Sequence, residues 1–232
     1  LLAVVGQGVA FKVYLAKDIR LNKCWAVKVH DKKSRDSEII MQMALQEVNM
    51  VESLDHPAIP KIVDIVDNEN YFCIVEEYVE GDTLEALLSK MGPQPVELVV
   101  ELGKQLCNVL GYLHSLNPPH IYRDMKPANI MLKPDGNIKI IDFGIMRLYD
   151  AKATADENCL GTLGYASPEH FGGKGQTDAR SDIYSLGVTL HRLLTGFNPS
   201  KDAPPPIRSI DPNLPIELEH IISKCTQPNL NK

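Results

Sequence analysis

The texture of the sequence changes near Gly81, and this change limits the folds open to the chain more than any other feature. Before Gly81, short segments rich in β-branched and aromatic residues are separated by turn or charged residues, which is typical of strands. A single long segment there consists mostly of strong helix formers. The predicted strands are residues 2–5, 12–16, 24–29, 61–66 and 71–76, and the predicted helix is 37–53. The first third therefore predicts a sheet accompanied by one main helix.

After Gly81, helical periodicity dominates. Residues 95–116 repeat apolar side chains at the spacing of one buried helix face. Residues 182–195 form a second apolar helix, and Gly196 follows it as a typical helix end. A shorter helix is predicted over 83–88, with Asp82 as its N-terminal cap.

The helical part also holds a predicted hairpin, with strands at 130–132 and 138–141 around a Pro-Asp-Gly-Asn turn. Residues 199–215 include six prolines, so we expect irregular surface there. The fold class that follows is α+β with two lobes. One is small, β-rich and has one main helix, the other is larger and mostly helical, and residues 77–81 connect them.

Composition excludes several classes of protein. The 232 residues are 44% hydrophobic and 23% charged, which is too apolar for a disordered chain. The net charge of −6 argues against binding nucleic acid through phosphate contacts, and no stretch reaches the roughly 18–20 apolar residues that span a bilayer. We expect no nucleic-acid partner and no membrane contact within this chain, with any anchor of the full-length protein lying outside it.

The five cysteines stand singly, and the seven histidines show no metal-ligand spacing. Reduced thiols of this kind are typical of the cytoplasm, so we predict a cytoplasmic domain. The histidines are interpreted as surface or loop residues.

The most specific segment is 122–129, Tyr-Arg-Asp-Met-Lys-Pro-Ala-Asn, which matches R-D-x-K-P-x-N at five fixed positions. With each residue type at about 5% frequency, a chance match in such a chain has a probability of about one in ten thousand. Asp142-Phe143-Gly144 is less specific, but it follows on the next predicted strand.

In this order, the motifs resemble the eukaryotic-type protein kinases, and most closely the bacterial serine/threonine kinases of Gram-positive type. Residues 6–8, Gly-Gln-Gly, resemble the loop that covers the phosphates, and 167–169, Ser-Pro-Glu, resemble the end of the activation segment. Asp182 resembles that family's buried structural aspartate. The implied division is an N-lobe at 1–76, a hinge at 77–81 and a C-lobe at 82–232 whose C-terminal end is cut short.

The resemblance implies a signalling enzyme that transfers the γ-phosphoryl group of ATP to serine or threonine of protein substrates. The resemblance also implies that the enzyme phosphorylates itself, and that two copies of the chain associate to do so. Asp124 would orient the acceptor hydroxyl and take its proton, while Lys126 would steady the transferred group and Thr162 would bond near both. Lys28 would bind the α- and β-phosphates, held in place by Glu47.

The resemblance further assigns Asn129 and Asp142 to Mg²⁺, or to Mn²⁺ in its place. A glycine-rich turn and apolar walls would hold the nucleotide, with Glu77 C=O and Val79 N–H pairing with adenine. The residues implied in nucleotide binding are Val5, Gly6, Gln7, Gly8, Val13, Ala26, Lys28, Glu77, Val79 and Met131.

The chain departs from the family pattern at several positions. The third glycine of the phosphate loop is replaced by Phe11, preceded by Ala10. Glu76 stands where an apolar side chain normally closes the adenine pocket, so we expect its carboxylate to find a donor or to face water. Thr154 is the predicted regulatory phosphorylation site, and Glu169 would lack its arginine partner if the domain is cut short.

Two alternatives remain. A pseudokinase, which binds nucleotide as a scaffold without transfer, is favoured by Phe11 and Glu76. A small-molecule phosphotransferase of kinase-like fold explains Asp124 and Asp142, but it does not explain the activation-segment residues 167–169.

Overall fold

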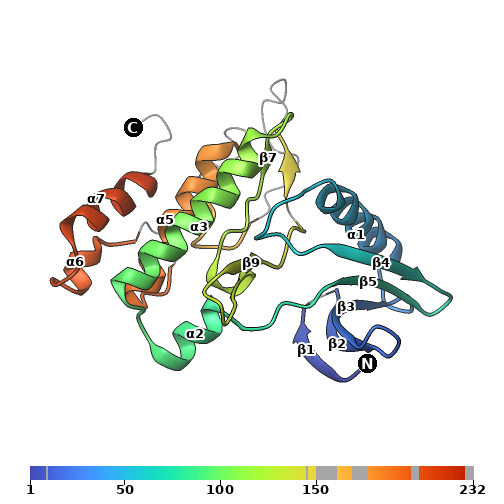
Figure 1. The fold of residues 1–232 in the computed structure, drawn as a ribbon. Helices are drawn as coiled ribbons and strands as arrows, with labels where there is room; N and C mark the ends of the chain where they lie inside the picture. The colour runs from blue at the N-terminus through green and yellow to red at the C-terminus, as the bar shows by residue number, and fades with distance from the viewer. Residues whose placement is uncertain (9, 145, 150–160, 169–176, 200–203, 228–232) are drawn as a thin grey trace. The chain divides into compact units, whose positions relative to one another are not determined.

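The computed structural model describes residues 1–232 except 9, 145, 150–160, 169–176, 200–203 and 228–232 (Figure 1). The chain divides into two compact units. The first comprises Leu1–Gly81 and Lys139–Gly144, and the second comprises Asp82–Ile138 and Ile145–Lys232.

The first unit is an antiparallel sheet with the helix α1 (Ser37–Glu52) packed beside it (Figure 1). The sheet order is β1-β2-β3-β5-β4. Its strands are β1 (Ala3–Gln7), β2 (Lys12–Asp18), β3 (Lys23–Asp31), β4 (Ile62–Asp67) and β5 (Tyr71–Glu77). Polar turns join them: the carboxylate of Asp18 accepts from the backbone of Arg20 and Leu21, and Asn68 closes the turn between β4 and β5.

The register of β3 and β5 decides which side chains meet α1. Ala26 lies opposite Glu76, Lys28 opposite Ile74, and His30 opposite Phe72. Residues directly opposite in an antiparallel pair share a face, and alternate residues along a strand do too. This face is the core of the unit, where Phe72 and Ile74 pack with α1. The core cluster is Ala44, Val48, Phe72 and Ile74, with Phe11, Met41, Ile62 and Ile65 packed against it.

The second unit is mostly helical. Its helices are α2 (Leu84–Met91), α3 (Val96–Ser115), α5 (Ala179–Thr195), α6 (Ile207–Ile210) and α7 (Ile216–Cys225), with the 3₁₀ turn η1 (Pro127–Asn129). The short strands are β6 (Asp82–Thr83), β7 (His120–Ile121), β8 (Ile130–Leu132) and β10 (Arg147–Leu148). β6 pairs with β8, β7 pairs with β10, and a turn leads from β8 into β9 (Ile138–Ile140).

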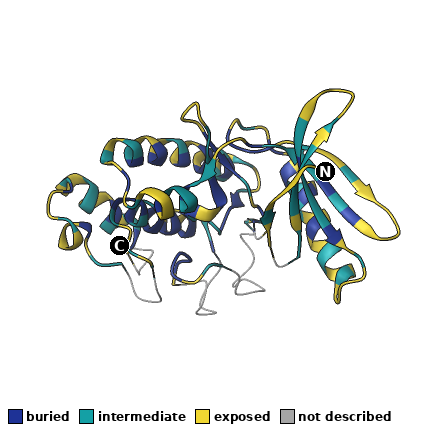
Figure 2. Cartoon of the chain, turned by 90° about the horizontal axis from the view of Figure 1, so that it is seen from below, coloured by how far each residue is buried: buried dark blue, intermediate teal, exposed yellow. Residues whose placement is uncertain are grey.

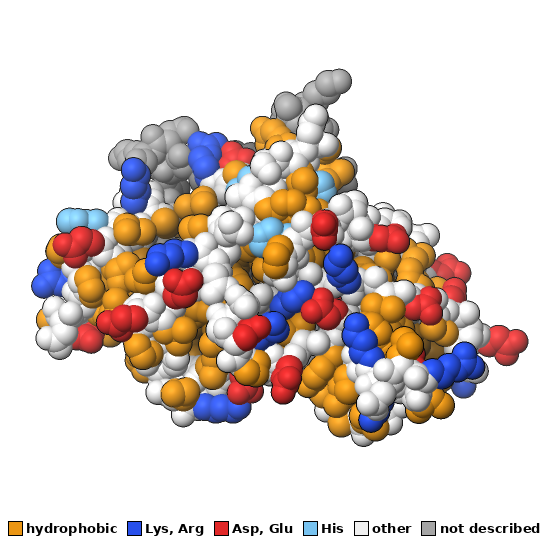
Figure 3. All heavy atoms as spheres, viewed as in Figure 1, with side chains coloured by type: hydrophobic (Ala, Val, Ile, Leu, Met, Phe, Trp, Pro, Cys, Tyr) orange, Lys and Arg blue, Asp and Glu red, His pale blue; other side chains and the backbone are white. Residues whose placement is uncertain are grey.

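The buried stripe predicted for residues 95–116 forms the inner face of α3, and α5 packs against it. Figure 2 shows these buried positions in dark blue along the helices. The face in Figure 3 carries lysine and arginine side chains interspersed with aspartate and glutamate, as the mixed composition predicts. Among the described residues, none of the helices has the length and apolar character needed to cross a bilayer.

Two predicted helix starts were wrong. The cap of α2 is Thr83, whose Oγ1 accepts from the backbone N–H of Ala86 at 3.1 Å. Asp82 instead belongs to β6, which pairs with β8, and its carboxylate binds Lys90. α5 begins before Asp182, because Asp178 forms a capping box there.

The proline-rich segment 199–215 is also more ordered than predicted over part of its length. It contains α6, and Ile207 is buried. A buried isoleucine gives this segment a packing role that its proline content does not indicate.

Candidate active site

The loop between β7 and η1 carries the predicted catalytic residues of the second unit. Lys126 Nζ donates to Asp124 Oδ2 and to Thr162 Oγ1, both at 2.7 Å. The Thr162 hydroxyl in turn donates to Asp124 Oδ1 at 2.7 Å. Asn129 Nδ2 donates to Asp124 Oδ2 at 2.7 Å and to its backbone oxygen at 3.1 Å. The Asp124 carboxylate is therefore held at both oxygens by fixed donors, and charge-assisted bonds of this kind are strong and directional.

Asp182, in the first turn of α5, anchors this loop. Its carboxylate is fully buried and accepts from the backbone N–H groups of Tyr122 at 2.9 Å and Arg123 at 2.7 Å. His114 Nε2 lies 2.8 Å from the same carboxylate. A buried carboxylate needs such partners, since burying an ionised group without them costs far more than burying a neutral polar group.

The anchoring explains an unusual backbone conformation. Arg123 has a φ of 72°, in the left-handed region that non-glycine residues rarely adopt. The bond from its own N–H to Asp182 holds it there, one residue before Asp124. The expectation that Asp182 is a buried structural aspartate is confirmed.

In the first unit, Lys28 lies between two carboxylates. Its Nζ is 3.6 Å from Glu47 Oε1 on α1 and 3.3 Å from Glu76 Oε2 on β5. The sheet register accounts for the second contact, because Glu76 lies diagonally across from Lys28 on the shared face. The expectation that Glu76 finds a donor is thus confirmed.

Burial and neighbouring charges shift the pKa values of both Lys28 and Glu76. Burial by itself lowers the pKa of Lys28, but attraction by Glu76, Glu47 and Asp142 outweighs it, so the pKa lies above its ordinary value. Burial raises the pKa of Glu76, and Lys28 only partly offsets this because Glu47 and Asp142 repel the same carboxylate. Lys28 is therefore a stable cation, whereas Glu76 holds a proton more tightly than an exposed glutamate does.

Asp142 follows β9 at the end of the first unit, and its Oδ1 accepts from the backbone N–H of Gly144 at 3.1 Å. Asn129 lies in the second unit, and its Nδ2 is used on Asp124, which leaves Oδ1 as its acceptor. Carboxylate and carboxamide oxygens are hard ligands that suit Mg²⁺ or Mn²⁺. Among the described residues, no three or more His, Cys, Asp or Glu side chains lie close enough together to hold a metal ion. The predicted ligands Asp142 and Asn129 are only two residues, one of them an amide, so this finding does not bear on them.

Met131 lies in the second unit, and all the other residues predicted to bind the nucleotide lie in the first. Gly6 pairs with Val13 next to an irregularity in β1, and a side chain at Gly6 would meet Val13 at 3.5 Å. Ala26 and Val79 are buried, whereas Val5, Gln7 and Gly8 are exposed. Thr154, Cys159 and Glu169 fall outside the described residues.

Sequence reasoning missed Lys139, a buried lysine on β9. Its Nζ donates to Glu77 Oε2 at 2.7 Å and to the Ile59 backbone oxygen at 3.2 Å. Glu77 also donates its backbone N–H to Lys61 O at 2.8 Å, so the first residue of the predicted hinge is held at both backbone and side chain. The sequence signal was weak, because a lysine in a short apolar strand is usually solvated.

The interpretation of the histidines was wrong for three of them. His30, His120 and His191 are buried, and each ring bonds a backbone oxygen. A fourth, His114, contacts Asp182 as described above.

Comparison with known proteins agrees with this geometry. The family model described as protein kinase domain matches residues 1–224. A probable serine/threonine-protein kinase of Clostridium perfringens is 32% identical over 98% of this chain and 35% of its own length. The serine/threonine-protein kinase PrkC of Bacillus subtilis is 34% identical, covering 97% of this chain and 37% of the relative. The serine/threonine-protein kinase PknB of Mycobacterium leprae is 36% identical over 84% of this chain and 32% of its own length. The chain thus spans about a third of the length of these relatives.

These matches confirm the predicted resemblance to the protein kinases and the α+β kinase fold. None of them favours the pseudokinase alternative. With a family model matching nearly its whole length, the chain belongs to the protein kinase domain family.

Proposed function

We propose that the protein containing this chain phosphorylates serine and threonine residues of other proteins, with the transfer carried out by the residues of this domain. The observation that supports this most is the network around Asp124. One carboxylate is fixed by Lys126, Thr162 and Asn129, with every heavy-atom distance to its own oxygens at 2.7 Å. A group held in this way can orient an acceptor hydroxyl without reorganising during the reaction.

In this proposal Asp124 accepts the proton of the acceptor hydroxyl. Lys126 shares its ammonium between Asp124 and Thr162, so it also brings positive charge to the place where the phosphoryl group is transferred. The Thr162 hydroxyl bonds both of these side chains and thereby ties the segment that follows residue 160 to the catalytic loop.

Lys28 would bind the α- and β-phosphates of ATP, and Glu47 and Glu76 hold its ammonium in place. Asn129 and Asp142 would hold the divalent cation, Mg²⁺ or Mn²⁺. Such an ion, when bound, neutralises phosphate charge and so favours transfer. The adenine would pair with backbone atoms of Glu77 and Val79, within the hinge at 77–81 between lobes 1–76 and 82–232.

The substrates are proteins with serine or threonine acceptors, and a second copy of the chain serves as substrate in autophosphorylation. The four described cysteines form no disulfide, which fits a reducing, cytoplasmic compartment.

The test is transfer from ATP labelled at the γ-phosphate, in the presence of Mg²⁺, with and without a generic basic protein as acceptor. We expect label on protein, and a loss of at least a hundredfold in the Asp124→Asn variant, whose binding of ATP should persist. ATP binding by the wild type without any transfer would overturn the proposal in favour of the pseudokinase. Label found only on added small hydroxyl compounds would point instead to the small-molecule phosphotransferase.

A further inference from the structure

His30 occupies a position that gives it access to the phosphate loop. It follows Lys28 by two residues on β3, so its side chain lies on the same face, and it is only 2% exposed. Neither the metal ligands nor the catalytic network of the proposed function includes it.

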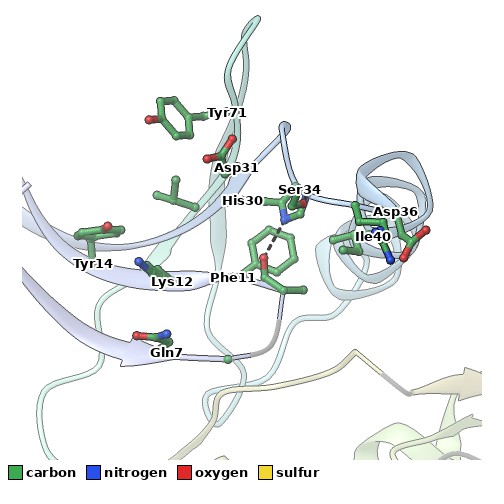
Figure 4. Close-up of a pocket in the computed structure, with 14 residues that line it drawn as sticks. Gln7, Phe11, Lys12, Tyr14, His30, Asp31, Ser34, Asp36, Ile40 and Tyr71 are labelled. Atoms are coloured by element: carbon green, nitrogen blue, oxygen red, sulfur yellow. Dashed lines mark hydrogen bonds between the residues drawn. The ribbon is translucent and has the colours of Figure 1, made fainter.

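The imidazole bridges two segments that are distant in the sequence. Its Nδ1 lies 2.7 Å from the backbone oxygen of Ala10, in the phosphate loop, as the dashed line in Figure 4 shows. Its Nε2 lies 3.0 Å from Oγ of Ser37, the first residue of α1, and 3.2 Å from Oγ of Ser34, in the turn before that helix. Because a carbonyl can only accept, Nδ1 must carry the proton that it shares with Ala10. In the neutral ring Nε2 then accepts from a serine hydroxyl, so the serines fix the tautomer that holds the loop.

Phe11 adds an apolar contact to this bond. Its ring centroid lies 5.4 Å from that of His30, with an angle of 49° between the planes, and the side chain packs against the core cluster of the first unit. The backbone N–H of Gly8 donates to Phe11 O at 2.8 Å and closes the turn. The residue that replaces the third glycine therefore points into the core and leaves the turn intact.

The loop and its contacts with His30 border a cavity. Gln7, Phe11, His30 and Ser34 line a cavity of about 540 Å³, shown in Figure 4. Packing on that side holds the loop only in part. The bond to His30 and the packing of Phe11 restrain it, together with the turn bond from Gly8 and the strand pairing of Gln7 with Lys12.

From this geometry we propose that His30 is a positioning residue of the phosphate loop. A third glycine would let the backbone adapt to the phosphates. In this loop the hydrogen bond from His30 instead holds Ala10 and Phe11 in one fixed arrangement. Holding the loop before ATP arrives lowers the ordering entropy that phosphate binding must overcome. This inference rests on the proposed role of residues 6–8 in binding phosphates.

The test compares His30→Phe, which keeps a buried ring but removes the donor, with His30→Asn, whose Nδ2 can replace Nδ1 as donor to Ala10. We expect His30→Phe to raise the KM for ATP about threefold to tenfold with kcat changed less than twofold, since one hydrogen bond is lost. His30→Asn should restore at least half of the difference. Affinity for adenosine, which has no phosphates, should stay unchanged in both variants. His220→Phe, at an exposed position on α7, is the control and should leave the KM unchanged.

Hydrogen exchange gives a second readout that requires no folded variant of His30. Amides of residues 6–12 should exchange at least threefold faster in the Ser34→Ala/Ser37→Ala double variant, because Nε2 then lacks its hydroxyl donors. Unchanged exchange there, or an unchanged KM in a folded His30→Phe protein, would overturn the inference. If Lys28→Met also left ATP binding intact, the proposed function itself would fail. If Lys28→Met weakened ATP binding but His30→Phe did not, the role of His30 would be refuted and the proposed function would stand.

Discussion

Glu76 presents a carboxylate to the same ammonium that is proposed to bind the phosphates of ATP. The Lys28 Nζ lies 3.3 Å from Glu76 and 3.6 Å from Glu47, and all three side chains are less than a fifth exposed. Asp142 adds a third carboxylate whose charge also acts on Lys28. We predict that Glu76→Gln, which removes one charge and keeps the shape, makes ATP bind more tightly.

The magnitude follows from the distances. A phosphate oxygen bound to an ammonium lies about 2.8 Å from it, which places the phosphate about 6 Å from the Glu76 carboxylate. Two unit charges about 6 Å apart repel by about 0.7 kcal/mol in water and by about 3 kcal/mol at an effective dielectric constant of about 20. Because the site is mostly buried but must admit the nucleotide, we expect a value between these limits, about 1 kcal/mol. This corresponds to about fivefold tighter ATP binding.

The assay is a titration of the wild type and the variant with ATP and, separately, with adenosine. Because the effect is a repulsion between charges, only ATP should gain affinity. Glu69→Gln, the same chemical change in an exposed turn of the same unit, is the matched control and should change neither Kd. Weaker ATP binding in Glu76→Gln would refute the reasoning and show that Glu76 mainly orients Lys28. An equal gain for adenosine would show that the side chain acts on the base instead.

The effect of Glu76 on ATP binding should depend on pH. Burial raises the pKa of Glu76 in the folded protein. Below this folded-state pKa the carboxyl is neutral, so the wild type should approach Glu76→Gln and the ratio of their ATP affinities should fall toward one. For stability the sign is also fixed: a raised pKa contributes stability below the unfolded-state pKa, and this is lost as the pH rises through the folded-state value. Glu76→Gln should therefore flatten the loss of unfolding free energy with rising pH.

Three further predictions concern other parts of the molecule. Gly187→Ala should destabilise the protein by about 1–3 kcal/mol in urea unfolding, because its Cβ would lie 2.6 Å from another side chain. Gly111→Ala, with open space in a helix, should stabilise it by about 1 kcal/mol, and the same sign for both would contradict the packing. Thr162→Ala should lower kcat about tenfold in steady-state phosphorylation of a peptide, whereas Thr162→Ser should stay within about threefold of the wild type, since the hydroxyl carries both bonds. Lys139→Met should raise the KM for ATP about threefold to tenfold with kcat retained, because the Glu77 carboxylate loses the ammonium that lies 2.7 Å from it. An unchanged KM would mean that the Lys139–Glu77 pair does not position the hinge.

Much of the site could be predicted because its residues are close together in the sequence. Asp124, Lys126 and Asn129 lie within one short segment, and their spacing carries the resemblance that implies their roles. The contact from Thr162 came from the resemblance, and the structure confirms it with bonds to Asp124 and Lys126. The α+β fold was also predictable, since strand and helix periodicities separate cleanly near Gly81.

The failures share a physical cause, which is that burial depends on partners far away in the sequence. His30 and Lys139 carry side chains that are normally solvated, and only the sheet register and the segments near Ala10 and Glu77 make their burial possible. The cap of α2 shows the same effect on a smaller scale. Asp82 and Thr83 are both good capping residues, and strand pairing of Asp82 decided between them.

The two departures from the family pattern converge on one face of β3. Lys28 contacts Glu76, and His30, the next residue on that face, holds the loop in which Phe11 replaces a glycine. The first contact acts on charge and the second on loop geometry, and they share no hydrogen bond. The effects of Glu76→Gln and His30→Phe on ATP binding should therefore be independent, so that the double variant shows the product of the two fold-changes within about twofold. A deviation larger than about threefold, measured as the ATP Kd in a double-mutant cycle, would mean that the loop and the lysine move together. In that case the charge of Glu76 would also set the position of the phosphate loop, and the two substitutions would represent a single adaptation of the nucleotide site.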